Sequence, residues 1–149
     1  MMEQTYLRLL EIVNGYTIID THEHLPAWET ERNYNTDVIN EYLTHYFNRD
    51  LISAGLSQAD LSKVLDTSIP IIERWYLLEP YWTVCRKTGY GRSLDITVKG
   101  LYNIEEINGK TIEELNDAFL KSMKPGWYKH VLKERSKIQT SILDCKTLM

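Results

Sequence analysis

The fold of this protein is decided by residues 17–25, which read TIIDTHEHL. Ile18 and Ile19 form a short apolar run that leads directly to two histidines, His22 and His24, spaced i, i+2. Because a β-strand projects every second side chain to the same side, the two imidazoles should leave one face together. The stretch therefore predicts a strand at about residues 17–24, with a candidate metal-ligating pair near its end.

Residues 18–25, IIDTHEHL, resemble the first-strand His-x-His motif of the amidohydrolase superfamily, whose members are metal-dependent hydrolases built on a (β/α)8 barrel. The resemblance implies that His22 and His24 bind a divalent metal ion. It also implies further ligands and a general base from later strands, and these cannot be matched here, so no catalytic residue is assigned. The alternative is that both histidines are ordinary polar residues at a strand-to-loop junction.

The identity of the metal does not follow from two histidines, because neutral imidazole suits several divalent ions. Zinc is the ion that we expect. A catalytic zinc usually keeps three protein ligands and one open position for water, and two histidines are too few. We therefore expect hydrolysis by metal-activated water in a longer parent enzyme, and no activity from this chain alone.

The second predicted strand covers about residues 138–144, and almost everything from 37 to 136 has a helical pattern. A (β/α)8 barrel usually takes about 250 residues, whereas this chain has 149. We therefore expect an α/β fold, namely the N-terminal portion of a (β/α)8 barrel of the TIM type. Residues 1–149 would form part of one barrel domain, in which a large helical insertion separates two strands that lie side by side and parallel.

Local signals add detail to the helical parts. Residues 3–13 carry Tyr6, Leu9, Leu10 and Val13 at helical spacing, which predicts an apolar stripe. Capping boxes are indicated at Ser57–Asp60 and at Thr111–Glu114, and residues 89–91, GYG, are predicted to end the long helix that precedes them.

A second resemblance concerns residues 43–51, which are similar to the His-Tyr segment that follows the first strand in uronate isomerases, a branch of the same superfamily. It implies substrate contacts from His45, Tyr46 and Arg49, since a planar guanidinium suits a carboxylate. The family motif continues with a Trp-Arg pair, which Phe47, Asn48 and Arg49 follow only in part. The alternatives are a sugar-acid isomerase, a half-buried His-Tyr pair with a solvated arginine, and a non-catalytic helical binding module.

Composition narrows the classes of partner. The net charge is −4 with acidic and basic residues interspersed, which gives no footprint for nucleic acid or for a membrane surface. No signal peptide is indicated, and Cys85 and Cys145 suggest buried thiols rather than a disulfide. We expect a cytoplasmic protein with a small-molecule substrate, and self-association through exposed strand edges.

Overall fold

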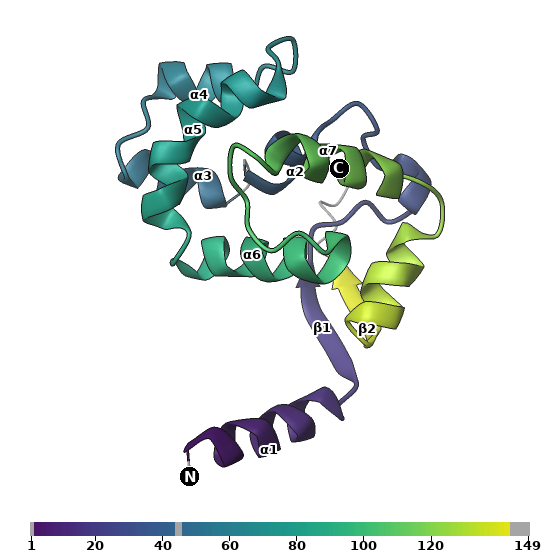
Figure 1. Ribbon diagram of the computed structural model, residues 1–149. Helices are drawn as coiled ribbons and strands as arrows, with labels where there is room; N and C mark the ends of the chain where they lie inside the picture. Colours follow the sequence, from purple (N-terminus) through teal and green to yellow (C-terminus); the bar gives the residue numbers. More distant parts are fainter. Residues whose placement is uncertain (1, 44–45, 144–149) are drawn as a thin grey trace. The chain divides into compact units, whose positions relative to one another are not determined.

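The protein is described by a computed structural model that covers residues 2–43 and 46–143 (Figure 1). Its contacts divide the chain into two compact units: residues 1–32 with 124–149 form unit 1, and residues 33–123 form unit 2. The elements of unit 1 are α1 (Met2–Asn14), β1 (Ile18–Glu23), the 3₁₀ turn η1 (Glu29–Glu31), the π-helical segment η2 (Lys129–Arg135) and β2 (Ile138–Leu143). Those of unit 2 are α2 (Val38–Leu43), α3 (Phe47–Ser53), α4 (Gln58–Val64), α5 (Ile71–Cys85), α6 (Gly89–Tyr102) and α7 (Ile112–Ser122).

The expected portion of a (β/α)8 barrel with a helical insertion is wrong. Over the described residues the chain is mostly helical, and its sheet consists of two short strands. A barrel buries side chains between a closed sheet and an outer ring of helices. Here the buried hydrophobic residues all lie between 38 and 119, where helices pack on helices. The described hydrophobic core is therefore formed by the helical part of the chain, and neither strand contributes a buried hydrophobic side chain to it.

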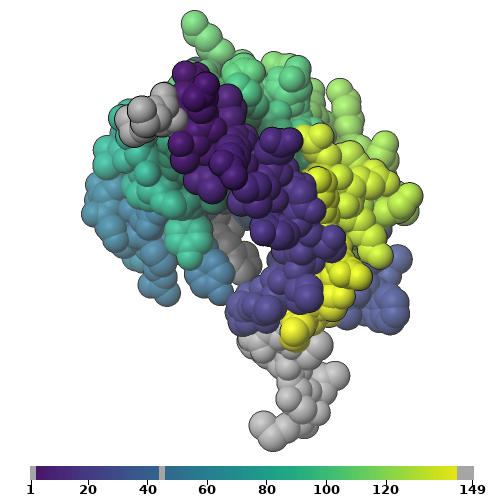
Figure 2. Space-filling model, turned by 90° about the horizontal axis from the view of Figure 1, so that it is seen from below, coloured from purple at the N-terminus to yellow at the C-terminus, as the bar shows by residue number. Residues whose placement is uncertain are grey.

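The two strands pair in parallel, as the sequence predicted (Figure 1). Ile18 lies opposite Ile138, and Glu23 lies opposite Leu143, with irregular register between these ends. The N–H of Ile18 donates to the carbonyl of Lys137 at 3.1 Å. Lys137 itself adopts a left-handed conformation with φ of 55°, which turns the chain from η2 into β2. Figure 2 shows the purple residues of α1 and β1 beside the yellow residues of β2.

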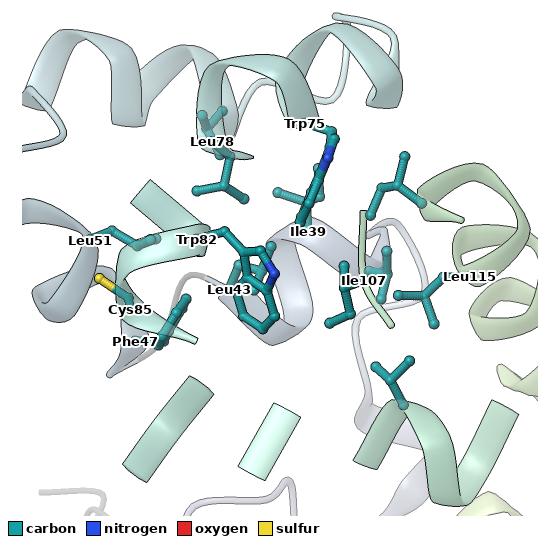
Figure 3. Packing of buried hydrophobic residues seen from close by; sticks show 14 of the residues in the cluster. Ile39, Leu43, Phe47, Leu51, Trp75, Leu78, Trp82, Cys85, Ile107 and Leu115 are labelled. Atoms are coloured by element: carbon teal, nitrogen blue, oxygen red, sulfur yellow. The ribbon is translucent and has the colours of Figure 1, made fainter. Parts of the chain in front are cut away.

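The core of unit 2 is formed by aromatic and aliphatic side chains from successive helices (Figure 3). Trp82 of α5 packs edge-to-face against Phe47 of α3, with 5.6 Å between the ring centroids, and lies 6.2 Å from Trp75. All three side chains are at most 2% exposed. Gly91 allows α6 to begin close to the end of α5, because a Cβ there would lie 2.5 Å from the carbonyl oxygen of Cys85.

A buried ion pair joins Asp37, the residue before α2, to Arg74 of α5. The guanidinium of Arg74 binds the carboxylate of Asp37, and both residues are less than 9% exposed. Arg74 also donates to the carbonyls of Val64 at 3.2 Å and Ile69 at 2.9 Å, while Asp37 accepts the N–H of Asn40 at 3.0 Å. A buried charge is tolerated when its hydrogen bonds are satisfied in this way. The pair therefore holds three segments of unit 2 together.

Of the local sequence signals, one predicted helix cap is confirmed, whereas a second cap and one predicted helix end are not. The cap at Ser57 is confirmed, since its hydroxyl oxygen accepts the N–H of Asp60 at 3.0 Å. At the predicted Thr111 box, the hydroxyl instead donates to the carbonyl of Glu106 at 2.6 Å and makes no cap bond. The prediction that residues 89–91 end a helix was wrong. Helix α5 ends at Cys85, and α6 begins at Gly89, directly after Thr88, whose side chain caps it.

Among the described helices, none is long and apolar enough to cross a membrane.

Candidate metal centre

The end of β1 brings the two predicted ligands together. His22 lies within the strand and His24 lies one residue beyond its last residue, Glu23. The imidazole centroids are 4.5 Å apart with the rings perpendicular, and both side chains are exposed to solvent. The i, i+2 spacing therefore produces the proximity that the sequence predicted for these two rings.

Two carboxylates hold the backbone around this pair. Oδ1 of Asp20 accepts the backbone N–H of His22 at 3.2 Å, and Oε2 of Glu23 accepts the backbone N–H of His24 at 3.2 Å. This bond of Asp20 is therefore to a backbone N–H group and not to an imidazole nitrogen. Both acids are half-buried and add negative charge beside the imidazoles. Such charge favours a cation over an anion at this strand end.

The donor set fits a metal ion in part. A ligating imidazole nitrogen stands about 2 Å from zinc, so two rings whose centroids lie 4.5 Å apart are close enough to share one ion when a nitrogen of each ring faces it. Within the part of the chain that the structure describes, no group of three or more His, Cys, Asp or Glu side chains could hold a metal. The pair therefore offers two ligands, fewer than the three that a catalytic zinc site normally takes from protein.

The loop after His24 is tied to the start of the last helical segment, a contact that sequence reasoning missed. Oε2 of Glu29 accepts the N–H of Gly126 and Oε1 accepts that of Tyr128, each at 2.9 Å. Arg32 lies over the ring of Tyr128, with 5.7 Å from its guanidinium carbon to the ring centroid. The partners are 97 and 99 residues apart in sequence for Glu29, so no local spacing could have indicated them.

The electrostatics of Glu29 follow from these bonds. Burial raises the pKa of its carboxyl, but the N–H groups of Gly126, Tyr128 and Trp127, together with Arg32, outweigh burial and lower the pKa below its usual value. Hydrogen bonds to the ionised form have this effect because they stabilise the charge. Glu29 therefore acts as an anion at the N-terminus of a helical segment, where the helix dipole also favours negative charge.

Two of the three predicted substrate-binding residues, Tyr46 and Arg49, belong to unit 2. Tyr46 is 52% exposed and stacks on Tyr90, with 5.9 Å between ring centroids and 13° between ring planes. Arg49 is exposed on α3, and its N–H donates to the carbonyl of Tyr46 at 3.1 Å. His45 lies outside the described residues. The structure thus places Tyr46 and Arg49 on one turn, in a different unit from His22 and His24.

Other reactive side chains have structural partners. His130 is half-buried, and its Nδ1 lies 3.1 Å from Oε2 of Glu134. This contact lowers the pKa of Glu134, and Lys129 lowers it further.

Cys85 is buried as expected and donates to the carbonyl of Asp50 at 3.3 Å. Burial raises the pKa of its thiol, and the charge of Asp50 raises it further, so it is a poor nucleophile. Asp144 and Cys145 lie outside the described residues.

Comparison with known proteins returns no relative. No protein-family model matches the chain, no curated protein matches it, and no solved structure matches it. The arguments about function therefore rest on the residues themselves.

Proposed function

We propose that this protein is part of a metal-dependent hydrolase in which His22 and His24 bind a divalent ion, with zinc as the expected ion; its first strand resembles that of the amidohydrolase superfamily, although the fold described above is not a barrel. The observation that supports this proposal is the pair of imidazoles whose ring centroids lie 4.5 Å apart at the end of β1. The IIDTHEHL motif at the same place is the second support. Histidines at i, i+2 on a strand end are suited to one shared ion.

Each residue of the site has a distinct part in this proposal. When bound, the ion supplies Lewis acidity and lowers the pKa of a water molecule toward about 7. His22 and His24 hold the ion, while Asp20 and Glu23 fix the backbone that carries them. The remaining ligands and the general base would come from groups outside the described residues. We therefore expect the present chain to bind zinc weakly and to show no turnover above background.

The substrate in this proposal is a small molecule, and we place the activity in the cytoplasm because the two cysteines indicate no disulfide framework.

A sugar-acid isomerase that uses the same ion is the second candidate. This candidate is favoured by Arg49, which is exposed one helical turn from Tyr46, because a planar guanidinium can donate two hydrogen bonds to a carboxylate. Parallel assays of a uronic acid and of a simple ester or amide on a longer parent enzyme would separate the two activities.

Zinc titration tests the metal proposal directly. The affinity of the wild-type chain is measured by competition with a chromophoric chelator, and that of His22→Ala and His24→Ala is measured in the same way. We expect each substitution to weaken zinc binding at least about tenfold, because each removes one of two ligands. His130→Ala, a histidine outside the pair, is the matched control and should bind as the wild type does. Unchanged affinity in both His22→Ala and His24→Ala would remove these residues from the site.

A further inference from the structure

A groove lies between η2 and β2, which pack against each other in unit 1 (Figure 1). Its volume is about 390 Å³, which falls in the range of about 300–1,000 Å³ that is usual for small-molecule sites. All of its lining residues lie between 128 and 141, so the groove belongs to unit 1 alone. It is separate from the proposed metal centre, because neither His22 nor His24 lines it.

The walls of the groove are mainly apolar. Tyr128, Leu132 and Ile138 line it, and all three residues are half-buried, so each keeps surface that a ligand can cover. Tyr128 lies directly before η2, Leu132 lies within η2, and Ile138 is the first residue of β2. Covering these side chains removes apolar surface from water, which favours the binding of an apolar body.

Two lysines give the groove a positive edge. Lys129 and Lys133, four positions apart on η2, both line it, and no acidic side chain of the described residues does so. Nζ of Lys129 lies 3.3 Å from Oε1 of Glu134. Over residues 2–43 and 46–143, Lys133 forms no ion pair. The groove therefore carries at least one positive charge that no described carboxylate balances.

The aromatic wall of the groove is held in place from outside it. Oε1 of Glu29 accepts the N–H of Tyr128 at 2.9 Å, and the guanidinium carbon of Arg32 lies 5.7 Å from the centroid of the Tyr128 ring. A side chain that is ordered before binding loses little conformational entropy when a ligand packs against it, and such preorganisation increases affinity. The groove thus combines a fixed aromatic surface with ammonium groups beside it.

We propose that this groove binds a small aromatic carboxylate. The flat apolar body packs against Tyr128, Leu132 and Ile138, and the carboxylate binds the ammonium groups of Lys133 and Lys129. Charge complementarity selects this class of ligand. A cation would be repelled by the two lysines, and a neutral molecule would gain nothing from them.

Titration of the intact chain with naphthoate, followed by the backbone ¹⁵N and ¹H shifts, tests the site. The matched probe is naphthamide, which has the same ring system without the charge. We expect naphthoate to shift amides between residues 128 and 141, and naphthamide to bind at least about threefold more weakly. Equal affinities for the two probes, or shifts confined to other parts of the chain, would overturn the proposal.

Lysine variants test the role of the positive edge. Lys133→Gln should weaken naphthoate binding about threefold and leave naphthamide binding unchanged, whereas Lys133→Arg should bind both probes as the wild type does. Lys121→Gln, on an exposed residue of α7, makes the same change of charge in unit 2 and is the matched control. It should leave both affinities unchanged. Equal weakening in Lys133→Gln and Lys121→Gln would reduce the effect to net charge and overturn the proposal.

A second copy of the chain is the alternative occupant of the groove. The amide shifts of residues 128–141 are therefore recorded without ligand over a range of protein concentrations, together with sedimentation velocity. We expect shifts that are independent of concentration, because the groove is then free to take the small ligand. Shifts that move with concentration at these residues, in step with formation of a dimer, would assign the groove to self-association and contradict the proposal.

Discussion

Unit 2 and unit 1 differ in how they bury apolar side chains. Among the described residues, every buried hydrophobic side chain belongs to unit 2, from Val38 to Phe119. In unit 1, by contrast, the apolar residues of α1, β1 and the segment between them are exposed: Tyr6, Leu7, Leu9, Leu10, Ile12, Val13, Tyr16, Ile18 and Ile19. The same kind of side chain is therefore core in one unit and surface in the other.

This difference shows which forces maintain each unit. Unit 2 has a dense hydrophobic cluster, whose burial is the main favourable term in folding. Unit 1 relies on the parallel strand ladder and on the Glu29 cap, and each of these contributes hydrogen bonds of modest net value. We therefore expect substitutions in unit 2 to have larger effects on stability than equivalent substitutions in unit 1.

The largest effect is expected from Trp82→Ala in the core of unit 2. This side chain is 1% exposed and packs against Phe47 and Trp75, so its removal leaves a cavity. We expect the free energy of unfolding, measured by urea denaturation, to fall by about 4 kcal/mol. Tyr76→Ala, on the same helix but 61% exposed, is the control. Similar losses in the two variants would contradict the assignment of the core.

The next largest effect concerns the buried ion pair. Asp37→Ala leaves the guanidinium of Arg74 buried without its counter-charge. The expected loss is about 3 kcal/mol in the same assay. The control is Asp117→Ala, an exposed acid on α7, which should change stability by less than about 0.5 kcal/mol. If Arg74→Met alone restores the stability of Asp37→Ala, the loss came from the unpaired charge.

A small effect is expected from Leu9→Ala in unit 1. Leu9 is 57% exposed, and its truncation should change the free energy of unfolding by no more than about 0.5 kcal/mol. Chemical denaturation at several protein concentrations is the appropriate measurement. A loss above about 2 kcal/mol would show that the apolar stripe of α1 is covered in solution, and the contrast between the units would then disappear.

The smallest expected effect is the response of unit 1 to acid. Because backbone N–H groups outweigh burial and hold the folded pKa of Glu29 below its unfolded value, the ionised carboxyl stabilises the fold above about pH 4.3. That stabilisation is lost as the pH falls through the lower, folded pKa. The amide shifts of Gly126 and Tyr128 should therefore titrate with a midpoint below the ordinary pKa of a glutamate. The transition should be absent in Glu29→Gln and retained in Glu31→Gln. A midpoint above the ordinary pKa of a glutamate would contradict the capping role.

Short-range signals predicted several features correctly. Helix α1, both strands and the Ser57 cap follow from patterns that span a few residues, where the period of apolar side chains or one hydroxyl decides the conformation. The proximity of His22 and His24 also follows from a short-range pattern, because a strand places residues i and i+2 on the same side. The ligand role of these histidines, and the substrate contacts of His45, Tyr46 and Arg49, stay predictions.

The sequence by itself determined where the strands lie, that they run parallel, and that two imidazoles meet at the end of β1. Only the tertiary structure decided that α5 and its neighbours form a separate core and that the Tyr6–Val13 stripe stays exposed. It also decided that Glu29 caps a helical segment about a hundred residues away. The physical reason is the separation along the sequence over which each interaction acts. Backbone periodicity acts over a few residues, whereas burial and capping depend on which distant segments meet.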